Sequence, residues 1–141
     1  MKVIIASDHA GYDLKERMKI LFSDKFEFED LGTFSEESVD YPDFAHPLSE
    51  KVASQEFPFG ILICGTGNGM AMCANKHQDI RAGLCWHPDI AKLVRQHNNA
   101  NILVMPARFI SEHTAAEIME AFFSTDFEGG RHQRRVDKIN L

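Results

Sequence analysis

Hydrophobic positions along the chain follow two alternating spacings. Short β-branched or apolar runs, typical of strands, cover residues 2–6, 26–31, 59–64, 82–85 and 102–105. Apolar residues between these runs recur at helical spacing or follow helix-start signals, which predicts helices at 12–23, 42–55, 70–76, 88–98 and 111–124. Residues 32–41 are loop-like, and the segment after Gly129-Gly130 is expected to form a hinge and a short terminal helix.

Alternation of strands and helices predicts the fold class. Consecutive parallel strands need a crossover, usually a helix, so we expect a doubly wound α/β fold with a five-stranded parallel sheet. Helices on both faces would make it a Rossmann-like three-layer sandwich. The run 59–64 should be the central strand, whereas 26–31 alternates apolar and acidic residues and should lie nearer an edge. With no repeat or linker, we predict a single domain over residues 1–141 that ends in a tail at 129–141.

Composition and charge narrow the class of protein. A hydrophobic share of 44% and a charged share of 26% are ordinary for a globular domain. No apolar run reaches membrane-spanning length and no secretory signal is visible, so we expect a cytoplasmic protein without a membrane partner. The net charge of −6 argues against general nucleic-acid binding. The odd number of cysteines, three, favours free thiols over a disulfide framework.

A glycine-rich turn follows the central apolar run. Cys64 is followed by Gly65, Gly67 and Gly69, but Met70 stands where the dinucleotide fingerprint needs its third glycine, and no nucleotide P-loop sequence follows. The simplest interpretation is a tight strand-to-helix turn that needs a positive φ angle. However, a thiol beside free amides at the start of a helix would also favour a thiolate and any negative charge on a substrate. The turn therefore predicts a nucleophile or base beside an anion hole.

Other polar residues collect in the loops that should follow the strands. Parallel sheets bind ligands at the carboxyl ends of their strands, which is where we expect these loops. The residues are Asp8, His9, Tyr41, Cys64, Thr66, Asn68 and Arg108. For two of them a local structural role competes with ligand binding, because Asp8 could cap the following helix and Thr66 could cap its own turn.

Histidine and arginine residues late in the chain are further candidates. His97 and Asn98 stand at a predicted helix end, where a histidine is either a capping or surface residue or a general acid/base. Arg131 and Arg135 are four residues apart, so on a helix they share a face and could bind one oxyanion, unless they belong to a solvated basic tail. The seven histidines show no zinc-site spacing and Cys-x-x-Cys is absent, so no metal site is expected.

Six motifs, spread over nearly the whole chain, resemble the ribose/galactose isomerase family. They are Ser7-Asp-His-Ala-Gly11, Asp40-Tyr-Pro42, Cys64-Gly-Thr-Gly67, Ala74-Asn-Lys76, Arg95-Gln-His-Asn98 and Gly129-Gly-Arg-His-Gln-Arg-Arg135. Ribose-5-phosphate isomerase B and the galactose-6-phosphate isomerase subunits of the lactose pathway belong to this family. The resemblance implies an enzyme of the pentose phosphate pathway that interconverts ribose 5-phosphate and ribulose 5-phosphate through a cis-enediolate. It also implies a homodimer or dimer of dimers with shared active sites, and no cofactor, metal or nucleic-acid partner.

The same resemblance implies a role for each candidate residue. Cys64 matches the proton-abstracting base and His97 the acid/base that opens the sugar ring. Thr66 would hold the enediolate together with the turn formed by Gly65, Gly67, Asn68 and Gly69. The matching substrate contacts are Asp8, His9, Tyr41 and Asn98, and the matching phosphate contacts are Arg108, Arg131 and Arg135, the last two in the 129–141 tail.

Two other functions are also consistent with these residues. A hexose 6-phosphate, such as allose 6-phosphate, is an alternative substrate. A sugar-phosphate-binding module without catalysis is an alternative of a different class, although the joint presence of Cys64, Thr66 and His97 argues against it.

Overall fold

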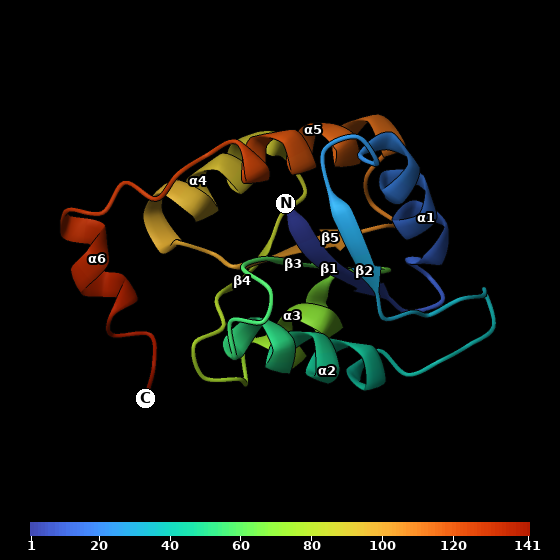
Figure 1. The fold of residues 1–141 in the computed structure, drawn as a ribbon, viewed down its shortest axis with the longest axis horizontal. Helices are drawn as coiled ribbons and strands as arrows, with labels where there is room; N and C mark the ends of the chain where they lie inside the picture. The colour runs from blue at the N-terminus through green and yellow to red at the C-terminus, as the bar shows by residue number, and fades with distance from the viewer.

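A five-stranded, all-parallel sheet lies between two layers of helices in the computed structural model, which describes residues 1–141 (Figure 1). The strands are β1 (Lys2–Ser7), β2 (Glu27–Asp30), β3 (Gly60–Cys64), β4 (Ala82–Leu84) and β5 (Ile102–Pro106). The helices are α1 (Tyr12–Leu21), α2 (Pro42–Ala53), α3 (Asn68–Ala74), α4 (Pro88–Asn98), α5 (Glu112–Phe123) and α6 (Arg131–Val136). The strand order is β2-β1-β3-β5-β4.

The predicted α/β class is confirmed, and every expected strand and helix is present. β3 is central and β2 is an edge strand, as the hydrophobic pattern indicated. α3 begins at Asn68, two residues earlier than expected, so Asn68 and Gly69 belong to its first turn instead of to the loop. No helix has the length and apolar character needed to cross a membrane.

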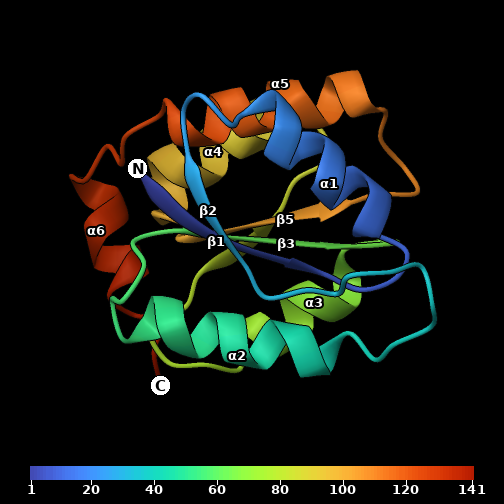
Figure 2. The ribbon, with the colours of Figure 1, turned by 45° about the vertical axis from the view of Figure 1, so that its right-hand side comes forward.

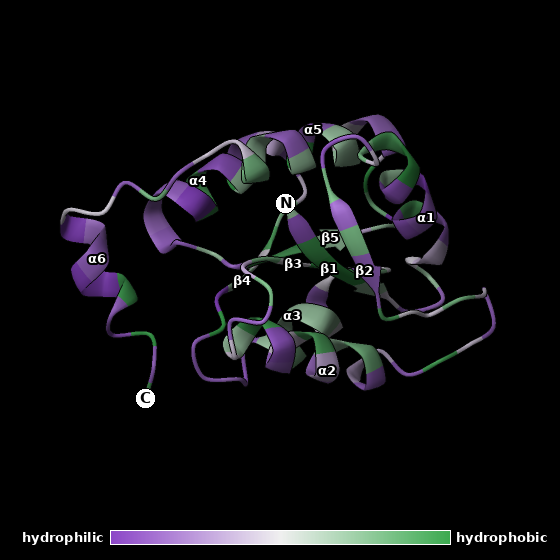
Figure 3. Ribbon diagram, viewed as in Figure 1, coloured by the Kyte–Doolittle hydropathy of each residue, from purple (hydrophilic) through white to green (hydrophobic).

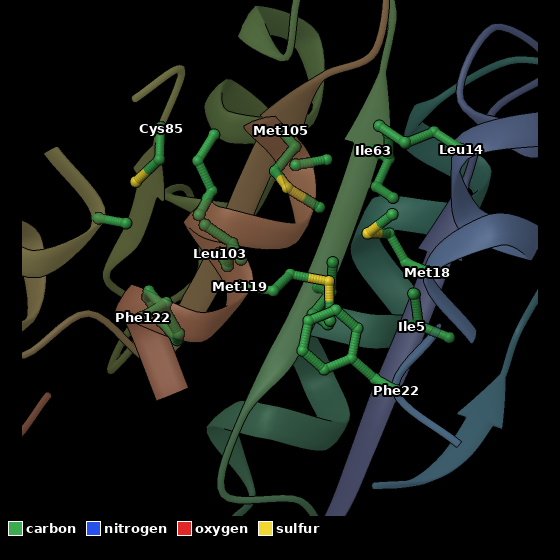
Figure 4. Close-up of a cluster of buried hydrophobic side chains, with 14 of the residues drawn as sticks. Ile5, Leu14, Met18, Phe22, Ile63, Cys85, Leu103, Met105, Met119 and Phe122 are labelled. Atoms are coloured by element: carbon green, nitrogen blue, oxygen red, sulfur yellow. The ribbon is translucent and has the colours of Figure 1, made fainter. Parts of the chain in front are cut away.

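Each face of the sheet has its own hydrophobic core. Alternate residues of a strand point to opposite faces, so Val3 and Ile5 pack beneath α1, α4 and α5, whereas Ile4 and Ala6 pack against α2 and α3. Figure 4 shows the first core, in which Met18 of α1 and Phe22, the residue that follows this helix, meet side chains of the strands and of α5. Figure 3 shows the apolar central strands between helices whose outer faces are hydrophilic. Helices therefore cover both faces of the sheet, so polar side chains that contact a ligand can lie only at the ends of the strands.

A buried lysine fixes the beginning of the loop between β2 and α2. Lys15 of α1 is fully buried and donates to Asp30 over 2.5 Å, and Lys19 donates to the same carboxylate over 2.8 Å. Burial alone would raise the pKa of Asp30, but hydrogen bonds from both lysines and from the Gly32 N–H lower it overall. The ionised Asp30 thus anchors the start of the loop that leads to Tyr41.

The two edges of the sheet carry different elements. The carboxyl ends of the five strands form one end of the sheet, the carboxyl edge, and their amino ends form the opposite end, the amino edge. Loops that follow the strands lie at the carboxyl edge, on the right in Figure 2. α4 runs back along the sheet, so its last residue, Asn98, lies near the start of β5 at the amino edge. α6 packs against α4 and also lies at the amino edge, on the left in Figure 2. This division decides which predicted site residues can meet within one chain.

Candidate active site

Cys64 is the last residue of the central strand and is only 5% exposed. The turn after it requires glycine at position 67, where φ is +78° and a Cβ atom would lie 2.3 Å from Leu84 Cδ1. The N–H groups of Gly65, Gly67 and Gly69 donate to no acceptor within the chain. The predicted arrangement of a thiol beside unpaired amides is therefore present at the carboxyl edge.

Two large side chains form walls around this turn. Arg108 lies on Gly65, where an added Cβ would be 3.2 Å from its Cδ atom, and its backbone N–H donates to the Gly65 carbonyl over 3.0 Å. Tyr41 lies on Gly69, where an added Cβ would be 2.5 Å from the ring. Gly65 and Gly69 thus leave room for the two side chains that flank the thiol.

Hydrogen bonds with the backbone orient three more of the predicted residues. Asp8 accepts from the Gly11 N–H over 3.1 Å, and Thr66 Oγ1 accepts from the Asn68 N–H over 3.2 Å. Thr66 thus caps its own turn, as foreseen, whereas Asp8 stabilises the turn before α1 and does not cap that helix, whose N-cap is Gly11 without a side-chain cap. His9 Nδ1 accepts from the Val39 N–H over 3.2 Å, so the neutral ring carries its proton on Nε2. The Thr66 hydroxyl and His9 Nε2 are left as donors for a ligand.

A second cluster of polar side chains lies at the amino edge, around the end of α4. The rings of His97 and His132 stack with centroids 4.3 Å apart, and Glu128 Oε1 lies 3.9 Å from His97 Nε2 and 3.5 Å from His132 Nε2. Burial lowers the pKa of His132, and the neighbouring His97 lowers it further. Arg131 and Arg135 are exposed on α6, and Asn98 is exposed beside His97. The potential metal-ligand atoms of Glu128 and the two histidines lie within 4.8 Å of one another.

The structure thus divides the predicted site into two groups. One group lies at the carboxyl edge and consists of Asp8, His9, Tyr41, Cys64, Gly65, Thr66, Gly67, Asn68, Gly69 and Arg108. The other lies at the amino edge and consists of His97, Asn98, Arg131 and Arg135. The five residues of β3 separate the two edges by about 16 Å, given the usual rise per residue. One chain alone therefore does not bring His97 to Cys64.

Sequence reasoning missed two members of the amino-edge cluster. Glu128 and His132 are four residues apart, a spacing that often places side chains together, but the glycines between them suggested only a hinge.

The other two cysteines behave as expected for thiols outside the site. Cys85 is fully buried, and burial raises its pKa to about 12, which makes it inert. Cys73 lies half-buried on α3, and burial raises its pKa as well. Of the three thiols, Cys64 is therefore the one that lies next to the unpaired amides of the turn.

Comparison with known proteins identifies the family. The family model described as Ribose/Galactose Isomerase matches residues 3–139. Ribose-5-phosphate isomerase B of Escherichia coli K12 is 42% identical over 98% of this chain and 93% of its own length. The crystal structure of a ribose 5-phosphate isomerase from Thermotoga maritima is 54% identical, with a TM-score of 0.96 over 99% of this chain and 97% of that one. The Mycoplasma genitalium ribose-5-phosphate isomerase B solved with bound ribulose-5-phosphate is 43% identical, with a TM-score of 0.92 over 98% and 93%. The chain belongs to the ribose/galactose isomerase family.

Proposed function

We propose that the protein is an aldose-ketose isomerase that interconverts D-ribose 5-phosphate and D-ribulose 5-phosphate, the reaction of the pentose phosphate pathway. The observation that carries the proposal is the Cys64 thiol next to three unpaired backbone amides at the carboxyl edge. A C–H bond beside a carbonyl group is a weak acid, so isomerisation needs both a base and a stabiliser for the enediolate oxygen. The turn supplies both.

Each step assigns one task to a residue. His97 protonates the ring oxygen and accepts the proton of the O1 hydroxyl, which opens the furanose. The Cys64 thiolate then removes the proton from C2, and the Thr66 hydroxyl and the glycine amides hold the resulting cis-enediolate. Return of that proton to C1 and transfer of the O2–H proton to O1 give the ketose. No oxidant is required, because the two electrons stay within the sugar.

The phosphate group of the substrate would lie away from the thiol. Arg131 and Arg135 have no carboxylate partner among the ion pairs of the chain, so both guanidinium groups are free to bind an oxyanion. The exposed Arg108 over Gly65 would contribute from the carboxyl edge. Binding the dianion between Arg108 and these two arginines of α6 would place the sugar carbons over Cys64.

A second copy of the chain would complete the site. The two groups of site residues lie at opposite edges of the sheet, so His97, Arg131 and Arg135 of one chain would reach Cys64 of another. Four aromatic side chains on the loops of the carboxyl edge are 40–72% exposed, and this apolar surface supports the proposal that a second chain covers that edge. They are Phe34, Tyr41, Trp86 and Phe109. We propose a homodimer, alone or paired into a dimer of dimers, with shared active sites.

An isomerase assay in the presence of a chelator tests the proposed reaction. We expect conversion of ribose 5-phosphate to ribulose 5-phosphate, followed by absorbance of the ketose, with higher kcat/KM than for allose 6-phosphate. Equal or higher kcat/KM for allose 6-phosphate would make the hexose phosphate the substrate. Binding of both sugars without turnover would instead indicate the non-catalytic module.

Replacing Arg135 with alanine is expected to raise the KM for ribose 5-phosphate at least about tenfold, because a charge-assisted contact to the phosphate is lost. Arg134 offers a matched control, since it precedes Arg135 on α6 and points to another face of the helix. Steady-state kinetics of both variants give the comparison. An unchanged KM in Arg135→Ala would remove this residue from the site.

A further inference from the structure

The cluster at the amino edge contains a side chain that the proposed isomerase reaction does not use. Glu128 has no part in the proposed mechanism, yet its Oε1 atom lies 3.5 Å from His132 Nε2 and 3.9 Å from His97 Nε2. The His132 side chain is nine-tenths buried, whereas His97 and Glu128 are about half exposed. Two imidazoles from different helices therefore present a nitrogen to one carboxylate oxygen at a site that solvent can reach.

Two histidines and one carboxylate are a ligand set that zinc prefers. Zinc binds nitrogen at about 2.0–2.1 Å and carboxylate oxygen at about 2.0–2.2 Å, so tetrahedral ligands lie about 3.3 Å from one another. Here all three ligand atoms lie within 4.8 Å of one another, and two of the separations are already 3.5 Å and 3.9 Å. The stacked rings must splay to converge on one ion, and the half-exposed His97 at the end of α4 is the ring that is free to do so. The remaining coordination position would be open to water.

We propose that His97, Glu128 and His132 form an inhibitory zinc site. A bound Zn²⁺ would occupy the nitrogen lone pair that His97 needs in order to accept and return a proton during ring opening. The consequence for activity rests on the proposed function of His97, whereas zinc binding itself does not. Zinc is thus a ligand that switches the enzyme off and takes no part in the reaction. The nearby Arg131 and Arg135 oppose the ion by charge repulsion, so the site responds to free zinc instead of holding it permanently.

Cys64 is the competing zinc ligand on this chain, because a thiolate binds zinc strongly. Within one chain it lies at the other edge of the sheet, but the proposed dimer brings Cys64 of a second chain to His97, so Cys64→Ala is needed to show that the thiol takes no part in zinc binding. Glu128 is the residue to change, since its side chain is exposed and its backbone N–H is held by the Gln96 carbonyl over 3.1 Å whatever the side chain. Glu117 is the matched control, because it forms a similar contact of 3.5 Å with His113 without a third ligand.

The experiment combines zinc binding with activity. Metal-free wild-type protein, Glu128→Gln, Glu117→Gln and Cys64→Ala are titrated with zinc chloride by calorimetry, and isomerase rates are recorded over the same zinc concentrations. We expect Glu128→Gln to keep its metal-free activity but to need at least about tenfold more zinc for binding and for inhibition, equivalent to about 1.4 kcal/mol. Glu117→Gln should respond to zinc as the wild type does, and Cys64→Ala should still bind it. With cobalt in place of zinc, the wild-type complex should lack thiolate-to-metal charge-transfer absorption.

Three results would overturn the proposal. One is unchanged zinc affinity in Glu128→Gln, another is loss of binding in Cys64→Ala, and the third is zinc binding that leaves the wild-type rate intact. Calorimetry separates this proposal from the proposed function, because a chain that binds zinc through Glu128 but turns over no sugar would contradict the isomerase assignment alone.

Discussion

Cys64→Ala is expected to lower kcat for ribose 5-phosphate by about 10³-fold, since general-base catalysis contributes about 10²–10⁴-fold. The substitution removes one sulfur atom from a side chain that is 5% exposed, and it leaves the turn amides and the arginines in place. Affinity for the sugar phosphate should therefore persist. Initial rates and calorimetric binding of ribose 5-phosphate measure the two quantities separately.

Cys73→Ala is the matched control for this substitution. Cys73 is a half-buried thiol on α3 whose pKa is raised by burial and, to a lesser extent, by the nearby Cys64, but it adjoins no unpaired amide of the turn. Its replacement should leave kcat within about twofold, as is usual for a site outside the reacting groups. Near-normal turnover in Cys64→Ala would refute the assignment of the base. Loss of sugar binding along with turnover would show that Cys64 holds the turn together instead.

In the proposed mechanism the anion hole lowers the activation free energy by a contribution that is separate from that of the base. Removal of one oxyanion donor costs about 2.7–4 kcal/mol of transition-state stabilisation in comparable enzymes. The backbone amides cannot be deleted by substitution, but the Thr66 hydroxyl can. One of its two lone pairs accepts from the Asn68 N–H, which fixes the position of the oxygen atom. In the proposed mechanism its hydrogen is the donor to the enediolate.

Local sequence patterns were sufficient to predict the fold. The β-branched runs and the helical spacing between them located every element to within two residues, because a parallel sheet buried on both faces needs continuous apolar strands. The glycine turn was predicted for a similar reason, since Gly67 adopts a φ angle that other residues rarely adopt. Both features depend on residues that are close together in the sequence.

The arrangement of the site could be predicted only in part. The carboxyl-edge residues follow strands, so the parallel topology alone brings Asp8, Cys64 and Arg108 together. His97 ends a helix that runs back along the sheet, and spacing along the sequence gives no measure of that separation. Glu128 escaped notice because its partner His132 lies beyond two glycines with positive φ, and only the folded chain shows that they meet over 3.5 Å.

Mixing two inactive variants is expected to restore activity if the site is shared between two chains. Cys64→Ala lacks the proposed base at the carboxyl edge, and His97→Asn lacks the proposed acid/base at the amino edge, so each homodimer should be inactive. In a mixed dimer one of the two sites takes Cys64 from one chain and His97 from the other, and that site is intact. Random association of equal amounts should therefore restore about one quarter of the wild-type activity, because half of the dimers are mixed and each has one working site.

A double variant, Cys64→Ala with His97→Asn, provides the opposite test of the same geometry. In a mixed dimer with the wild type, both sites lack one of the two groups, so equal amounts should lose about half of the activity of the wild-type chains present. Subunit exchange is verified by mass spectrometry of the intact dimers before the rates are compared. If one chain contained the complete site, the single variants would not complement each other and the double variant would not inhibit. The two mixtures therefore decide whether the edges of the sheet, about 16 Å apart in one chain, meet through a second copy.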